Sequence, residues 1–166
     1  FTLSTEICRF FYDNNKKIPN KVVSQTKKEI KIIEKISKKK FGDFINPLLL
    51  SVRSGARVSM PGMMDTILNL GLNDKTVKAL SSKTSNGRFA KDSYRRFIQM
   101  YGNVVMGIES YHFEELIENY KLTKGVLLDT DLDEHDWDGL IEDFKRMVKE
   151  KAKKDFPQDV YEQLLS

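Results

Sequence analysis

The sequence contains few of the residue types that form disulfides or common catalytic centres. Its 166 residues include one cysteine, Cys8, and two histidines, His112 and His135. A single cysteine excludes an internal disulfide and fits a reducing compartment, so we expect a cytoplasmic protein. The neighbouring Phe10 and Phe11 predict a buried Cys8 thiol. Both histidines lie among acidic residues without a serine or cysteine at a triad spacing, so we interpret them as solvated or ion-paired.

Long apolar runs and the common nucleotide-binding glycine motifs are also missing. No apolar stretch approaches the roughly 20 residues of a membrane-spanning helix, so we expect no membrane contact. The absence of G-x-x-x-x-G-K-[ST] and of G-x-G-x-x-G excludes a Walker P-loop and a dinucleotide-binding fingerprint. Hydrophobic residues make up 40% of the chain and charged residues 31%, which is the balance of a globular protein with a core.

An arginine and a run of small residues lie between two predicted strands. The first strand, over 48–53, ends in Arg53, and a loop over 54–65 leads to a second strand over 66–71. Small residues after a strand let backbone N–H groups form an anion-binding nest, and a planar guanidinium suits phosphate oxygens. We expect the first strand to be buried, where a lone arginine charge would need a partner. The pattern predicts a phosphate-binding segment, with a structural salt bridge at Arg53 as the alternative.

The rest of the chain has helical periodicity. It predicts helices ending near 14–15, over 21–40, around 77–80, over 88–106, from 110 onward and over 133–152. The last of these is strongly amphipathic, and we interpret it as core packing. The predicted fold class is α+β, with a small mixed lobe followed by a bundle of about four helices.

Charge is distributed unevenly along the chain. Residues 16–40 hold ten lysines and two glutamates, whereas residues 109–143 hold twelve acidic residues and two lysines. A basic helical module that binds RNA or another polyanion through Lys16 to Lys40 is therefore an alternative function. We favour a solvated face and no nucleic-acid partner, because no aromatic residue for base stacking lies among these lysines.

Residues 129–139 superficially resemble a calcium-binding loop. A register starting at Asp129 puts Glu134 where glycine is needed and Leu140 where the bidentate glutamate is needed. A register that uses Gly139 ends at Lys145 instead of an acid. Both registers fail, and the segment predicts an acidic helix N-terminus.

Two blocks of the sequence resemble the pyruvate, phosphate dikinase family in its N-terminal nucleotide-binding domain. The first block covers 52–66, including the run Met60-Pro61-Gly62-Met63-Met64, and continues over 68–73. The second covers 88–106, and the spacing between the blocks also matches. Phosphoenolpyruvate synthase and glucan water dikinase share only a looser skeleton of Arg-Ser, a loop glycine and an acidic residue.

The resemblance implies a fold, an activity and partners. Residues 1–72 would be part of an ATP-grasp-like lobe, residues 73–158 a mostly helical subdomain, and residues 159–166 the start of a truncated element. The full-length parent would be a phosphotransferase that converts ATP, pyruvate and phosphate to AMP, phosphoenolpyruvate and diphosphate through a phosphohistidine on another domain. The resemblance also implies ATP and Mg²⁺ as cofactors, contacts with the remaining domains of the polypeptide, and a homodimeric parent.

The resemblance further assigns residues to ATP. The positions that match are Arg53, Ser54, Gly55, Gly62, Met64, Thr66 and Arg96. In this assignment Arg53 contacts ATP, Gly62 offers its N–H to a phosphate, and Arg96 reaches toward the γ-phosphate. Asp65 would orient the loop or support a metal, and the Met60–Met64 run would be a flexible lid over the nucleotide, with core filling as the alternative.

Helix geometry alone does not favour a shared ligand for the two adjacent arginines of the second block. Arg95 and Arg96 point about 100° apart on a helix, so they are not expected to reach one ligand. Solvation, or salt bridges to the acidic helices, is the alternative for both arginines.

The resemblance places other essential groups outside this chain. The phosphocarrier histidine belongs to another domain, the family's Gly-Gly-Lys-Gly segment would precede Phe1, and the metal-binding acids would follow Ser166. The chain begins without methionine and ends on a helical pattern without a stop signal. We therefore expect a fragment with no catalytic residue or metal ligand of its own, and we expect it to be inactive alone.

Overall fold

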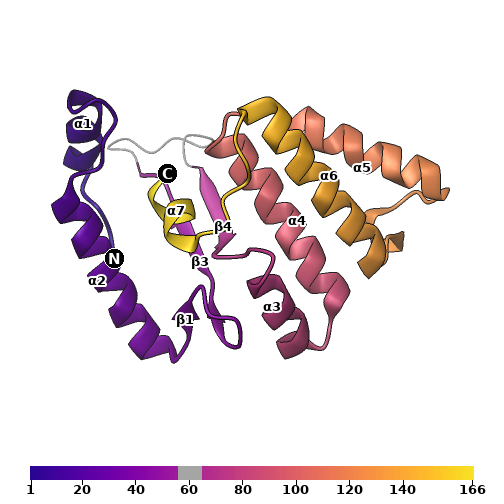
Figure 1. Ribbon diagram of the computed structural model, residues 1–166, viewed down its shortest axis with the longest axis horizontal. Coiled ribbons are helices and arrows are strands. Elements are labelled where there is room, and N and C mark those ends of the chain that lie inside the picture. The colour runs from indigo at the N-terminus through magenta and orange to yellow at the C-terminus, as the bar shows by residue number, and fades with distance from the viewer. Residues whose placement is uncertain (56–64) are drawn as a thin grey trace.

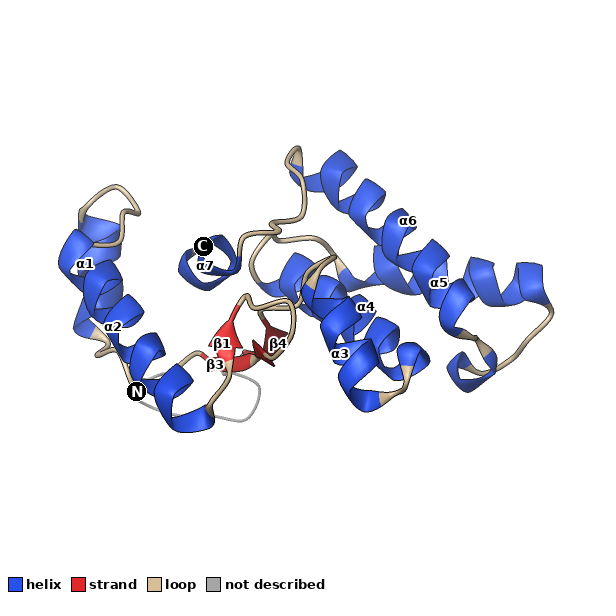
Figure 2. Cartoon of the chain, turned by 60° about the horizontal axis from the view of Figure 1, so that its bottom comes forward, coloured by secondary structure: helices blue, strands red, loops and turns tan. Residues whose placement is uncertain are grey.

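The computed structural model describes residues 1–55 and 65–166. Figure 1 shows three parts: two N-terminal helices at one end, the strands and the C-terminal helix in the middle, and the remaining helices at the other end. The turned view in Figure 2 keeps the same order. The elements are α1 (Glu6–Asp13), α2 (Asn20–Ser37), β1 (Lys40–Phe41), β2 (Pro47–Leu48), β3 (Leu50–Arg53), β4 (Thr66–Leu70), α3 (Thr76–Thr84), α4 (Gly87–Val104), α5 (Ser110–Lys124), the 3₁₀ helix η1 (Asp129–Asp131), α6 (Glu134–Ala152) and α7 (Val160–Leu165).

The described strands form two small sheets. Strands β1 and β2 pair in parallel, and β3 and β4 pair antiparallel. The strand predicted over 48–53 is thus divided between the sheets. The β3–β4 register shifts between Leu50 and Val52, where Asn69 of β4 adopts a left-handed φ of +59°. Such an irregularity is a β-bulge, which bends the ribbon just before it reaches Arg53 and Thr66.

Helix α4 organises the helical part of the structure. It packs against α3, α6 and β4, and its buried face carries Tyr94, Phe97 and Tyr101. Asn86 starts this helix by accepting a hydrogen bond from the Phe89 N–H at 2.9 Å, which satisfies one of the free donors of the first turn. The helix predicted over 88–106 is confirmed with slightly shifted ends. Helices together with two small sheets confirm the α+β class at this coarse level.

The C-terminal helix α7 returns to the strands. Buried Gln163 accepts a hydrogen bond from the Gly71 N–H at 3.0 Å and donates to the Leu72 and Pro157 carbonyls, each at 2.9 Å. The Phe41 and Tyr161 rings also meet edge to face, with centroids 5.3 Å apart. The last residues therefore pack on the end of β4, and the division at residues 72 and 158 stays a prediction.

Two local predictions for the N-terminal part are wrong. Cys8 is exposed, because α1 has no buried residue and its apolar face is not covered by the described part of the chain. The second helix ends at Ser37 instead of Lys40, since Lys38 adopts a left-handed φ of +54° and Lys40 begins β1. The Glu34 carboxylate accepts a hydrogen bond from the Phe41 N–H at 2.8 Å, which connects the helix to that strand.

Candidate phosphate-binding site

The predicted phosphate loop begins and ends at two hydrogen-bonded residues. The Ser54 N–H donates to the Asp65 carbonyl at 2.9 Å, and the Asp65 N–H donates to the Ser54 hydroxyl at 2.9 Å. The antiparallel pairing of Arg53 with Thr66 precedes this closure. The Ser54 N–H is therefore engaged at the base of the loop, and the contact of Ser54 with a phosphate stays a prediction. Asp65 uses its backbone to hold the loop base.

Arg53 is exposed, and the expectation that it ends a buried strand is wrong. In β3 Leu50 is half-buried, and Ser51, Val52 and Arg53 are exposed. The physical reason is that β3 and β4 form a two-stranded ribbon, so β3 has fewer neighbours to cover its side chains than a central strand of a larger sheet would have. Within the described residues no salt bridge involves Arg53, so a structural ion pair does not account for it there.

The other predicted loop residues divide into two groups. Gly55 is exposed, and within the described residues nothing lies within 4 Å of the position that a Cβ would take, so a ligand can approach its backbone. Thr66 is half-buried at the start of β4. Gly62, Met64 and the rest of the predicted Met60–Met64 lid lie outside the described residues.

The two adjacent arginines of α4 have different surroundings. The Arg95 guanidinium is buried, lies 4.8 Å from the ring centroid of Trp137 on α6, and donates to Gln99 at 2.9 Å. The Arg96 side chain is 61% exposed. Both arginines pair with Asp92 of their own helix, Arg95 at 2.5 Å and Arg96 at 3.0 Å. Salt bridges to the acidic helices are therefore not what holds them. The spacing of Asp92 three and four residues before the arginines is the sequence signal that could have identified this cluster.

Helix α4 also contacts the strand that follows the loop. The Leu68 N–H of β4 lies 3.2 Å from the sulfur of Met100, which is one helical turn after Arg96 on the same side of α4. Leu68 is two residues after Thr66, which pairs with Arg53. The side of α4 that carries Arg96 and Met100 thus contacts the β3–β4 ribbon through Met100.

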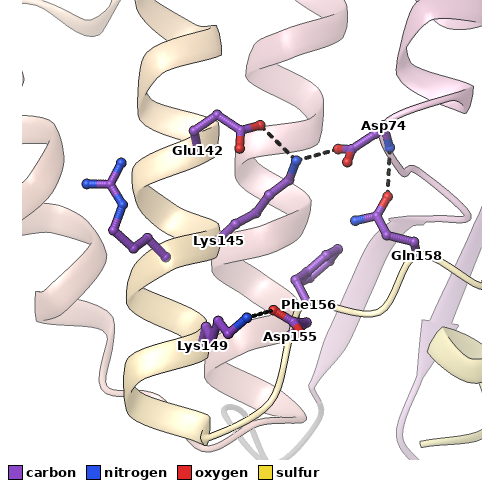
Figure 3. Close-up of a pocket in the computed structure, with 8 residues that line it drawn as sticks. Asp74, Glu142, Lys145, Lys149, Asp155, Phe156 and Gln158 are labelled. Carbon is purple, nitrogen blue, oxygen red and sulfur yellow. Dashed lines mark hydrogen bonds and ion pairs between the residues drawn. The ribbon is translucent and has the colours of Figure 1, made fainter.

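A cavity of about 450 Å³ lies elsewhere, between α6, the start of the α3 segment and residues 155–158. Figure 3 shows its charges facing one another: Lys145 pairs with Asp74 at 2.5 Å and with Glu142 at 2.9 Å, and Lys149 pairs with Asp155 at 3.0 Å. Burial lowers the pKa of Lys145, but its hydrogen bonds to Asp74 and Glu142 outweigh burial and raise it. The ion pairs across this cavity join separate segments of the chain. Because its charges are of both signs and already paired, the cavity is a poor site for an anion.

The acidic segment before α6 forms a helix cap, as predicted. The Asp133 carboxylate accepts from the Asp136 N–H at 2.9 Å, and the Asp136 carboxylate accepts from the Asp133 N–H at 3.1 Å, which is a capping box. A hydrogen bond from Lys124 lowers the pKa of the Asp136 carboxyl. Among the residues that the structure describes, no group of three His, Cys, Asp or Glu side chains could hold a metal ion.

The remaining surface predictions concern the basic helix and the membrane. The ten lysines of residues 16–40 are all exposed, which fits a solvated face, and the Lys27 ammonium lies 5.3 Å from the ring centroid of Tyr161. In the described ranges, no helix has both the length and the apolar character to cross a membrane.

Comparison with known proteins gives strong matches over nearly the whole chain. The chain is 49% identical over 164 residues to pyruvate, phosphate dikinase from Entamoeba histolytica and 52% identical over 166 residues to the Clostridium symbiosum protein, covering 99% of this chain in each case. It is 49% identical over 163 residues, or 98% of this chain, to a chloroplastic pyruvate, phosphate dikinase from Flaveria pringlei. A chloroplastic relative leaves the cytoplasmic location a prediction.

These matches cover one segment of each relative. The chain spans 18%, 19% and 17% of the lengths of these three curated proteins, respectively. No family model matches the chain. Over nearly its whole length, the chain is therefore homologous to one segment of the pyruvate, phosphate dikinases.

Proposed function

We propose that this chain is part of the ATP-binding portion of a pyruvate, phosphate dikinase. The full-length parent would convert ATP, pyruvate and phosphate to AMP, phosphoenolpyruvate and diphosphate through a phosphohistidine on another domain. The observation that supports this proposal is the identity of about one residue in two to three dikinases over at least 98% of the chain. In this proposal residues 1–72 belong to an ATP-grasp-like lobe and residues 73–158 to a helical subdomain.

The residues of the site would act on the phosphates electrostatically. Arg53 is exposed at the end of β3, so its guanidinium can form charge-assisted hydrogen bonds to phosphate oxygens. The Ser54–Asp65 hydrogen bonds would fix the base of the loop, with Gly55, Gly62, Met64 and Thr66 around the nucleotide. Arg96 would approach the γ-phosphate from α4. Together these groups would offset the negative charge that moves during phosphoryl transfer.

The site would be completed by other parts of the polypeptide. The described residues contain no acidic cluster for Mg²⁺, so the Mg²⁺ that bridges the phosphates would be held mainly by groups outside this chain. Mg²⁺ neutralises phosphate charge when it is bound. The isolated chain would therefore lack dikinase turnover. The proposal also includes a homodimeric parent.

The Arg53→Ala substitution in the full-length polypeptide tests this proposal. We expect ATP-dependent phosphorylation of the enzyme to fall by roughly one to two decades, because a hydrogen bond to a charged group contributes about 1.5–3 kcal/mol. Exchange between pyruvate and phosphoenolpyruvate on pre-phosphorylated enzyme should stay near wild type. Arg9→Ala is the matched control, since the Arg9 side chain is 88% exposed on α1. Equal loss of both half-reactions in a folded Arg53→Ala enzyme would contradict the assignment.

The basic-helix alternative predicts a different result. If Lys16 to Lys40 bind RNA, binding should weaken steeply with salt and should survive Arg53→Ala. The exposure of all ten lysines is compatible with such binding but is equally expected of a solvated helix face. An RNA titration at two salt concentrations separates the two functions.

A further inference from the structure

We propose that Asp92 is a positioning residue that orients Arg96 toward the nucleotide phosphates. This inference rests on the proposed function, in which Arg96 contacts ATP. The Asp92 carboxylate divides its two oxygens between two arginines. Its Oδ1 accepts a hydrogen bond from Arg95 Nη2 at 2.5 Å, and its Oδ2 accepts one from Arg96 Nε at 3.0 Å.

The buried pair in this cluster, Arg95 and Asp92, is held in place by further contacts. Arg95 is 5% exposed, its guanidinium lies over the Trp137 ring, and its Nη1 donates to Gln99. A buried guanidinium needs a counter-charge, which Asp92 supplies. The Asp92 side chain is itself only 20% exposed. The orientation of its carboxylate is therefore fixed by groups on both α4 and α6.

Arg96, the exposed member of the cluster, is accessible to a ligand. The Arg96 side chain is 61% exposed, and its only side-chain hydrogen bond among the described residues uses Nε. Its two terminal amino groups, the pair that forms bidentate contacts with phosphate, do not take part in that bond. A flexible arginine loses rotamer freedom when it binds, so holding its Nε in advance reduces the cost of placing the fork. The packing of Trp137 thus holds Arg95, Arg95 holds the Asp92 carboxylate, and Asp92 in turn orients Arg96.

A double-mutant cycle in the full-length enzyme tests this role. We expect Asp92→Asn to lower kcat/KM for ATP about tenfold, and Arg96→Ala to lower it about thirtyfold or more. In the Arg96→Ala background, Asp92→Asn should change kcat/KM less than about twofold, because its effect passes through Arg96. The control is Asp143→Asn, which removes the carboxylate that pairs with Arg146 at 3.0 Å three residues later on α6, and it should leave kcat/KM near wild type.

Each outcome of the cycle has a distinct meaning. A tenfold effect of Asp92→Asn that persists without Arg96 would overturn the positioning role, as would an effect of Arg96→Ala with none of Asp92→Asn. No effect of Arg96→Ala would instead remove Arg96 from the proposed site, while Arg53→Ala still reports on ATP binding. If Asp92→Asn fails to fold, Asp92→Glu keeps the charge but moves the carboxylate by one methylene, and its coupling to Arg96→Ala is the criterion.

Discussion

Hydrogen bonds of one buried glutamine contribute to the attachment of α7 to the strands, and Gln163→Leu tests their contribution. Leucine keeps most of the side-chain volume, so the substitution removes hydrogen bonds without creating a large cavity. The Gly71 N–H and the Leu72 and Pro157 carbonyls lose their partner, and all three residues are buried. Each unpaired buried group costs about 1–3 kcal/mol at full burial. Because α7 can partly detach and let water in, we expect a total loss of about 2–5 kcal/mol in unfolding free energy.

The measurement is urea unfolding of the 166-residue chain, followed by circular dichroism. We expect a mostly helical spectrum and cooperative unfolding, since a chain of this size can bury a substantial core. The loss predicted for Gln163→Leu is a large fraction of a typical stability of about 5–15 kcal/mol. Gln25→Leu makes the same chemical change at an exposed position on α2 and should shift the unfolding free energy by less than about 0.5 kcal/mol.

Hydrogen exchange at the Gly71 amide gives a local measurement of the same contact. Its acceptor is the Gln163 side chain, so the amide should exchange faster in Gln163→Leu even if global stability changes little. Equal unfolding free energies for Gln163→Leu and Gln25→Leu, with unchanged exchange at Gly71, would refute the docking of α7. A non-cooperative, strand-dominated wild-type spectrum would refute the α+β fold itself.

Two further predictions concern nucleotide binding and pH. The chain alone should bind MgATP weakly or not at all, because in the proposed function it supplies one side of a divided cleft and lacks the contacts of the opposing lobe. A micromolar dissociation constant in calorimetry, lost in Arg53→Ala, would contradict this. Since its folded pKa lies below the ordinary 3.8, ionised Asp136 stabilises the fold above about pH 4, and this contribution disappears as pH falls through the folded pKa. In urea unfolding, Asp136→Asn should therefore destabilise the chain at pH 7, and this destabilisation should shrink as the pH is lowered below 3.8 through the folded pKa; an effect that does not shrink at any acidic pH would contradict the ionic role.

Local patterns in the sequence predicted the helices better than the strands. The apolar period of 88–106 and the caps at Asn86 and Asp133 depend on neighbouring residues, so α4 and the start of α6 were predictable. The strand over 48–53 was predicted as one buried element, because an apolar run does not tell which partner each residue has. Its pairing with β1 on one side and β4 on the other comes from contacts that no local pattern specifies.

Long-range contacts also explain why the surroundings of several residues could not be predicted from the sequence. Gln163 lies more than 90 residues from Gly71, and nothing in its local sequence predicts that it is buried. Asp92 could have been identified from its spacing to the two arginines, but its fixed orientation comes from Trp137 on another helix. The prediction of a buried Cys8 on α1 was wrong for the same reason, since an amphipathic helix is buried only where another element covers it.

The distribution of arginines between buried and exposed positions supports the choice of Arg53 and Arg96 over Arg95 as ligand contacts. Arg95 is surrounded by Asp92, Gln99 and the Trp137 ring, so a ligand would have to replace contacts already made in a buried place. The other two guanidiniums are exposed and, among the residues that the structure describes, keep donors for a phosphate. An exposed cation binds weakly in water and is screened by salt, so two of them cannot hold a nucleotide tightly by themselves. In the proposed function, a closing lobe would exclude water and make their contribution large, so the same arginines would be essential in the full-length parent and weak in the isolated chain.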